Sequence, residues 1–139
     1  MVTVDYDHEM PYAHDENGER YPRLTLRLAS PADPEQAIRT DAYLDSGAGR
    51  SLFNGELTPT LGIDLFAGPE FTFQSTTGDR LTARLHSVRI EHDLLGSFDM
   101  EVAFSTAHIG RNLLGRDFFS LIQIGFRDRH LVLYVTPQP

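Results

Sequence analysis

Apolar and polar side chains alternate in many short stretches of this chain, and this alternation restricts its fold more than any other feature. In the clearest stretch, Leu24, Leu26 and Leu28 are each separated by one polar residue. Such alternation is typical of a β-strand with one buried face. Further strands are predicted over residues 38–44, 51–53, 71–75, 81–90, 98–104, 123–126 and 130–135, with short helices over 54–61 and 118–122. The pattern predicts an all-β domain.

One of these predicted strands changes its alternation part-way along. Between residues 81 and 90, apolar side chains occupy odd positions up to Leu85 and even positions from Val88 onward. A shift of one residue moves side chains to the opposite face of a strand. We therefore expect a bulge or a switch of sheet near His86.

The first twenty residues are more polar than the rest and predict a division of the chain into an acidic N-terminal arm, 1–20, and a domain, 21–139. The arm is expected to be irregular or a loose hairpin. Its acidic residues are spaced in a way that faintly resembles a calcium loop, but Met10 stands where that loop needs glycine. A solvated acidic loop is the expectation.

Composition excludes several classes of chemistry. The net charge of −8 predicts no nucleic-acid partner, because an acidic surface repels phosphates. The chain has no cysteine and no lysine, which excludes thiol, zinc-thiolate and Schiff-base chemistry. We expect no metal site, because no histidine has a metal-ligand partner at a suitable spacing; the histidines are His8, His14, His86, His92, His108 and His130.

No stretch of the sequence is long and apolar enough for a membrane helix. The start of the chain lacks the basic residues and apolar core of a secretory signal. The expectation is a soluble, cytoplasmic protein with no membrane partner.

Asp45 is the strongest candidate for a catalytic residue. It follows the apolar end of a predicted strand and begins the small-residue turn Ser46-Gly47-Ala48, whose side chains cannot shield its carboxylate. Backbone N–H groups of such a turn can point at the carboxylate, and Gly47 permits close backbone approach. An Asx-turn, in which Asp45 only caps its own loop, fits these residues as well.

A second segment, 112–119 (Asn-Leu-Leu-Gly-Arg-Asp-Phe-Phe), begins with an apolar strand and leads through glycine into a charged helix start. Together with the Leu-Asp-Ser-Gly-Ala segment at 44–48 and the hairpin between them, it resembles the retropepsin-like family, the single-domain aspartic peptidases of the retroviral protease type. The three marks occur in the family's order and cover roughly residues 21–135. The resemblance implies an acid-protease barrel with a flap hairpin and one or two short helices.

The resemblance also implies roles for individual residues. Asp45 matches the catalytic aspartate, and Ser46 matches the residue whose hydroxyl bonds to the partner's loop. Gly47 and Ala48 match the backbone that lines the substrate cleft. The flap tip corresponds to Thr76, Thr77, Gly78 and Asp79, and the segment packed beneath the active-site loop to Gly115 and Arg116.

The sequence departs from the family pattern at Gly49. Retroviral members usually carry an acidic residue at this place, where it meets the arginine of the late motif and an amide of the substrate. Arg116 is therefore expected to have a different partner. Ser51 fits the serine or threonine that commonly follows this loop, and Asp117 corresponds to a helix start behind it.

Aspartic peptidolysis needs two carboxylates that share one proton, and the chain holds a single Asp-Ser-Gly. The expected function is therefore that of a homodimeric aspartic endopeptidase that cleaves extended peptides or proteins with paired Asp45 residues and no cofactor. The alternative is a noncatalytic dimerisation or peptide-binding module on the same fold. A third reading is an acidic β-barrel that binds a small apolar ligand through Phe71 and Phe73.

Overall fold

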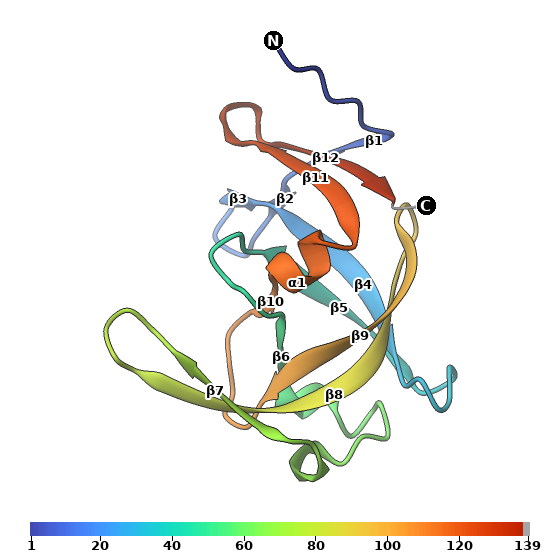
Figure 1. Cartoon of the computed structure of the whole chain (residues 1–139), viewed down its shortest axis with the longest axis vertical. Helices are drawn as coiled ribbons and strands as arrows, with labels where there is room; N and C mark the ends of the chain where they lie inside the picture. The colour runs from blue at the N-terminus through green and yellow to red at the C-terminus, as the bar shows by residue number, and fades with distance from the viewer. Residues whose placement is uncertain (138–139) are drawn as a thin grey trace.

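A closed sheet of antiparallel and parallel strands forms the centre of the computed structural model, which describes residues 1–137. β8 pairs with β4 as well as with β7 and β9, and this pairing closes the sheet into a barrel from which β7 extends (Figure 1). The strands in order across the sheet are β4 (Arg23–Ala29), β5 (Ala37–Leu44), β10 (Asn112–Leu114), β6 (Leu52–Asn54), β9 (Gly96–Ser105), β8 (Arg80–His92) and β7 (Glu70–Gln74). The predicted all-β class is confirmed.

The barrel interior is filled by the apolar halves of the alternating strands. Leu24, Leu26 and Leu28 are all buried, as their alternation predicts. The largest fully buried side chains are Phe53, Phe104, Phe118, Leu26, Leu28, Leu61, Ile90 and Leu114. Burial of such side chains contributes about 1.5–3 kcal/mol each relative to exposure, which makes the barrel the rigid support for the loops at its ends.

β8 explains the change of alternation seen in the sequence. Its register with β9 is continuous from Ala83 to His92, so the expected bulge is absent from this pair. Its other edge pairs with β7 up to Arg84 and with β4 from Arg89, so β8 changes its partner strand within one sheet and the expected switch of sheet is also absent. Ala83 and Leu85 pack in a small cluster with Leu52 and Ala103, whereas Val88 and Ile90 face the main core. The two halves of one strand thus bury opposite faces.

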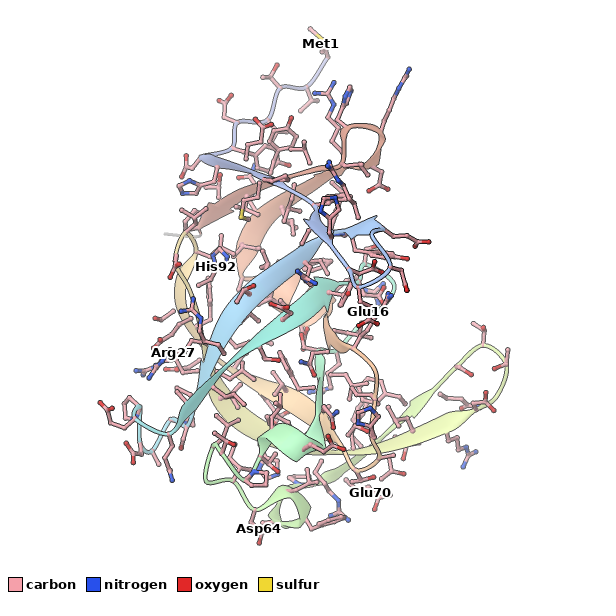
Figure 2. The ribbon with its side chains drawn as sticks, turned by 180° about the vertical axis from the view of Figure 1, so that it is seen from behind. Met1, Glu16, Arg27, Asp64, Glu70 and His92 are labelled. Atoms are coloured by element: carbon pink, nitrogen blue, oxygen red, sulfur yellow. The ribbon has the colours of Figure 1, made fainter. Side chains whose placement is uncertain are left out.

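A second sheet joins the two ends of the chain. β1 (His8–Pro11) pairs with β12 (Val132–Pro137), which pairs in turn with β11 (Ile122–Arg127). Within the segment assigned to the N-terminal arm, β2 (Ala13–His14) and β3 (Arg20–Tyr21) also form a small hairpin. This end of the molecule carries Met1, opposite the end that carries Asp64 (Figure 2).

Helical structure is short. The elements are the 3-10 turns η1 (Gly55–Leu57), η2 (Leu65–Ala67) and η3 (Asp128–His130) and the single helix α1 (Arg116–Phe119). The helix predicted over 54–61 is present only as the 3-10 turn η1, capped by the Asn54 side chain. It is shorter than predicted because Pro59 has no N–H to continue the helical bonds, and the Thr58 hydroxyl bonds the Gly55 carbonyl. The predicted helix over 118–122 is also shorter, because Ile122 already belongs to β11. No helix within residues 1–137 has the length and apolar character needed to cross a membrane.

Tyr12 links the terminal sheet to the turn of its hairpin and generates a test of the fold. The ring is buried, and the hydroxyl donates a hydrogen bond to Asp128 Oδ1. Burial, together with the bond to the Asp128 carboxylate and its negative charge, raises the pKa of Tyr12. The folded protein therefore retains this proton at a pH where the unfolded chain, with a tyrosine pKa of about 10, has lost it.

We expect Tyr12→Phe to lower the free energy of unfolding at neutral pH by about 1 kcal/mol, the usual net value of one hydrogen bond. Above pH of about 10, the wild type should lose stability with rising pH, and the difference between the two proteins should narrow. Denaturant unfolding at pH 7 to 11 measures this. Tyr134→Phe is the control, because the Tyr134 hydroxyl makes no hydrogen bond within residues 1–137. A constant difference across the pH range would contradict the prediction.

Candidate active site

Asp45 stands directly after β5, at the point where two barrel strands end together. β10 runs parallel to β5, with Leu114 beside Leu44, and the Asp45 N–H donates to the Leu114 carbonyl at 2.9 Å. The Asp45 carboxylate accepts the Gly47 N–H at Oδ1, at 2.8 Å, and the Ala48 N–H reaches the Asp45 carbonyl at 3.1 Å. The loop therefore contains the Asx-turn that the sequence left open.

This turn leaves one oxygen of the carboxylate available. Asp45 is half-buried, and its Oδ2 accepts no hydrogen bond from residues 1–137. Fixing Oδ1 to the backbone holds the orientation of the carboxylate, and Oδ2 remains free for a water, a substrate or a second carboxylic acid.

Gly115 and Arg116 lie against this loop, where the sequence placed them. The Arg116 N–H donates to the Ala48 carbonyl at 2.8 Å. A Cβ on Gly115 would come within 2.6 Å of that same carbonyl oxygen. The close approach of the two backbones therefore requires glycine at this position.

The carboxylate of Asp117 binds Ser51, at the end of the loop that begins at Asp45. It accepts the Ser51 N–H at 2.9 Å and the Ser51 hydroxyl at 2.7 Å, and Ser51 Oγ accepts the Gly115 N–H at 3.0 Å. Ser51 is fully buried. The sequence placed Asp117 behind the loop and Ser51 after it, but it gave no sign that the two side chains bond each other.

A cleft of about 580 Å³ lies between this loop and the β7–β8 hairpin. Its walls are mainly apolar, with a few polar groups on the hairpin side. The lining residues are Asp45, Gly47, Ala48, Leu52, Phe73, Gln74, Ser75, Asp79, Arg80, Leu81 and Leu113. Of the predicted site residues, Asp45, Gly47, Ala48 and Asp79 therefore share one cleft.

The hairpin projects from the barrel as an arm (Figure 1), and it starts at Glu70, labelled in Figure 2. Thr76, Thr77 and Gly78 form its tip and do not line the cleft. Gly78 has φ of +92°, and a Cβ there would meet no atom within 4 Å. The Ser75 N–H bonds the Asp79 carbonyl at 2.9 Å, so the tip is a closed turn with little packing around it.

Arg50 connects the base of the hairpin to the active-site loop. Its guanidinium lies 4.7 Å from the centre of the Phe71 ring and forms an ion pair with Glu101 at 3.1 Å. Phe71 contacts Phe73 edge to face, and Phe73 lines the cleft. Sequence reasoning missed Arg50, because neither its spacing nor its neighbours distinguish it from a solvated arginine.

Ser46 faces away from the cleft. It is exposed, its hydroxyl makes no hydrogen bond within the described part of the chain, and it lines a separate groove of about 460 Å³ together with Tyr12, Tyr21, Leu44 and Phe126. Ser46 is therefore accessible to a second molecule on the side of the loop opposite the hairpin.

The different ion-pair partner that we expected for Arg116 is not found within residues 1–137. The Arg116 side chain is exposed and forms no ion pair within residues 1–137. One guanidinium nitrogen, Nη2, lies 3.4 Å from the point where a Cβ on Gly49 would stand. The place of the missing acidic side chain is thus open.

Comparisons with solved structures identify this architecture. A retropepsin-like aspartic protease from Rickettsia conorii superposes with a TM-score of 0.61 at 15% identity, over 97% of this chain and 96% of that one. EIAV protease in complex with the inhibitor HBY-793 superposes with a TM-score of 0.54 at 16% identity, over 76% of this chain and 91% of that one. The chain has the retropepsin-like fold. No protein-family model and no curated protein sequence matches it.

The retropepsin-like fold confirms the architecture that the sequence motifs implied. The identity to both structures is low. Shared architecture at this identity does not carry catalytic roles from one protein to another, so the roles of the site residues depend on their own geometry and chemistry.

The contact between Gly115 and the loop generates a stability test. We expect Gly115→Ala to destabilise the protein by about 1–3 kcal/mol, because the new methyl group would overlap the Ala48 carbonyl. Gly110→Ala is the matched control, since a Cβ there meets nothing within 4 Å. Thermal unfolding of both variants measures the difference. Equal midpoints would show that the loop moves away at little cost.

Proposed function

We propose that this protein is an aspartic endopeptidase that works as a homodimer, with Asp45 of each copy forming the catalytic pair. The observation that carries the proposal is Asp45 itself, which stands at the wall of a peptide-sized cleft on a retropepsin-like fold with one carboxylate oxygen free. The proposed substrates are extended peptides or protein segments, and no cofactor takes part.

A second copy is needed because neither of the two acids nearest the site within residues 1–137, Asp117 and Asp79, is a suitable partner for Asp45. Asp117 uses its carboxylate to bind Ser51 and the Phe118 N–H. Asp79 is the other acid that lines the cleft, but it lies at the exposed tip of the hairpin, where its carboxylate accepts the Thr77 hydroxyl at 3.3 Å. A two-fold axis beside Asp45 would supply an identical carboxylate and would bring Ser46 of each copy toward the other loop.

In the proposed reaction, the ionised member of the pair removes a proton from a water molecule, whose oxygen attacks the carbonyl carbon of the scissile bond. The protonated member donates its proton to the carbonyl oxygen. The tetrahedral intermediate then collapses: the C–N bond breaks, the amine nitrogen takes the proton that the first carboxylate removed from water, and one hydroxyl of the intermediate returns its proton to the second carboxylate. Two like charges held close together cannot both ionise readily, and this keeps one proton on the pair.

A noncatalytic peptide-binding or dimerisation module is the second candidate. It is favoured by the Asx-turn at Asp45, which gives the carboxylate a structural role within its own loop. The two candidates share the cleft and the dimer, and they differ in whether Asp45 changes a covalent bond.

Asp45→Asn separates them. The amide keeps the size of the side chain and can accept the Gly47 N–H, but it cannot share a proton, so peptide hydrolysis should disappear while the fold and the dimer persist. The test is turnover of a peptide library, with sedimentation to measure the dimer. Asp93→Asn, an exposed position in the β8–β9 turn, should retain activity. Unchanged turnover in Asp45→Asn would refute the enzymatic proposal.

Mixing experiments test the pairing of two copies. After equal amounts of wild-type and Asp45→Asn chains exchange, activity should fall to about half, because random pairing places about half of the wild-type chains in mixed, inactive dimers. Activity that stays proportional to the wild-type chains present would place both carboxylates in one chain. Loss of turnover in Asp79→Asn would then identify the second acid.

We also propose that the β7–β8 hairpin acts as a flap that closes over the bound peptide. Its tip buries little and should open at low free energy. Gly78→Val should strain the left-handed backbone at the tip without a clash. Gly18, with φ of +79° and no neighbour within 4 Å, offers the same change in another hairpin.

We expect Gly78→Val and Gly18→Val to lose similar stability, by about 1 kcal/mol or more. Only Gly78→Val should also lose kcat/KM, by roughly tenfold or more, which corresponds to about 1.4 kcal/mol at the transition state. Thermal midpoints and kcat/KM measured side by side decide the matter. If turnover in Gly78→Val follows the folded fraction alone, the hairpin is not a flap.

A further inference from the structure

We propose that Arg116 forms a subsite for a carboxylate of the substrate, an acidic side chain that lies beside the Asp45 loop. This inference rests on the proposed peptidase function and names a feature of the substrates it would select. It concerns the space left open at Gly49 and the guanidinium that faces it.

The geometry places a cation at this space, and no carboxylate of residues 1–137 forms an ion pair with it. Arg116 Nη2 lies 3.4 Å from the Cβ position of Gly49, in the same loop as Asp45, Gly47 and Ala48, which line the cleft. Gly49 and Arg116 are both exposed. Gly49 and Arg116 lie beyond the residues that line the cleft, next to Ala48 at its wall. A substrate carboxylate that reached past Ala48 would find both the room and the charge that an acidic residue at position 49 would otherwise use.

Six of the twelve arginines in this acidic chain form ion pairs, and Arg116 is not one of them. Ion pairs with aspartate or glutamate engage Arg23, Arg27, Arg50, Arg84, Arg89 and Arg111. Of the arginines without such a pair in residues 1–137, Arg116 lies against the Asp45 loop, Arg80 lines its cleft, and Arg20 lines the separate groove at Ser46. An exposed guanidinium is stable in water without a partner, so the lack of an ion pair alone does not indicate a binding site. The inference depends on the position of Arg116 beside the loop.

Arg116 is also fixed in place through its backbone. Its backbone N–H bonds the Ala48 carbonyl, and the next residue, Asp117, is fixed to Ser51. A donor whose backbone is already ordered loses less freedom on binding. The planar fork of an arginine can bind both oxygens of a carboxylate, which favours a glutamate or aspartate over its amide.

The test begins with a peptide that the wild type cleaves, selected from a mixed peptide library. Matched peptides carry Glu or Gln at each position flanking the cleaved bond, and kcat/KM is measured for each pair. At one position, we expect the Glu peptide to be preferred by about tenfold, a ratio equal to about 1.4 kcal/mol. Arg116→Gln should reduce this ratio to about one, since an amide retains no charge to attract the carboxylate.

Two substitutions at Gly49 provide a sharper comparison. Gly49→Asp places a carboxylate beside the guanidinium and should abolish the preference for Glu. Gly49→Asn has the same size without the charge and should retain a clear preference. Arg39→Gln is the control for the change in net charge. Arg39 stands opposite Arg27 in the register of β4 and β5, and Arg27 lies on the side of the molecule away from the hairpin (Figure 2).

The outcomes separate the two proposals. The subsite is overturned if the wild type cleaves Glu and Gln peptides with a kcat/KM ratio near one. It is also overturned if Arg80→Gln changes this ratio and Arg116→Gln does not. Both results leave the peptidase proposal intact. A weaker dimer in Arg116→Gln with an unchanged ratio would assign Arg116 to the contact between copies and would also overturn it.

Where no peptide is cleaved, the binding of fluorescent Glu and Gln library peptides decides the question. Tighter binding of a Glu peptide that is lost in Arg116→Gln supports the subsite and refutes the peptidase. No preference for Glu, or no binding at all, overturns the subsite.

Discussion

The bond between the Asp117 carboxylate and Ser51 is the interaction on which the rest of the site depends. It joins the start of α1 to the end of the Asp45 loop, and Ser51 Oγ passes the connection on to the Gly115 N–H. Ser51 is completely buried, so loss of this carboxylate would leave polar groups without partners in the interior, at a cost of about 1–3 kcal/mol for each group. This connection ties the end of the Asp45 loop to Gly115 and to the helix that begins at Arg116.

The barrel supplies the second constraint. Because β5 and β10 run in parallel, their ends meet at one place, and the loop that begins at Asp45 and the helix that begins at Arg116 start side by side. The cleft is then completed by β7 and the first half of β8, which have left the barrel. In the terminal sheet, β12 already has β1 and β11 at its two edges, so a second copy of the chain cannot extend that sheet through β12. In the proposed dimer, contacts through this sheet would have to use the outer edge of β1 or β11, and the exposed Ser46 offers a contact at the Asp45 loop.

Most strands were predictable because burial on one face leaves a visible period of two in the sequence. The same period revealed the change of face in β8, although it did not distinguish a bulge from a change of partner. The helix over 54–61 ends after one turn because Pro59 lacks the N–H that a longer helix needs. Contacts between distant segments leave no local signal in one sequence. Examples are the pairing of β1 with β12, the bond between Ser51 and Asp117, and the contact of Arg50 with Phe71. The grouping of Asp45 with the hairpin came from the family resemblance, since no periodicity indicates which loops share a cleft.

The pairing of β1 with β12 has a consequence for how the chain folds. β4 meets β5, β7 meets β8 and β8 meets β9 through short connections, whereas β1 must meet a segment near the other end of the sequence. The entropy lost in closing so long a loop is recovered only when both segments have a formed barrel to dock against. We therefore expect the terminal sheet to assemble last and to open first. Backbone amides of β1 should then exchange with solvent faster than those of β8, which is bonded to neighbours along both edges.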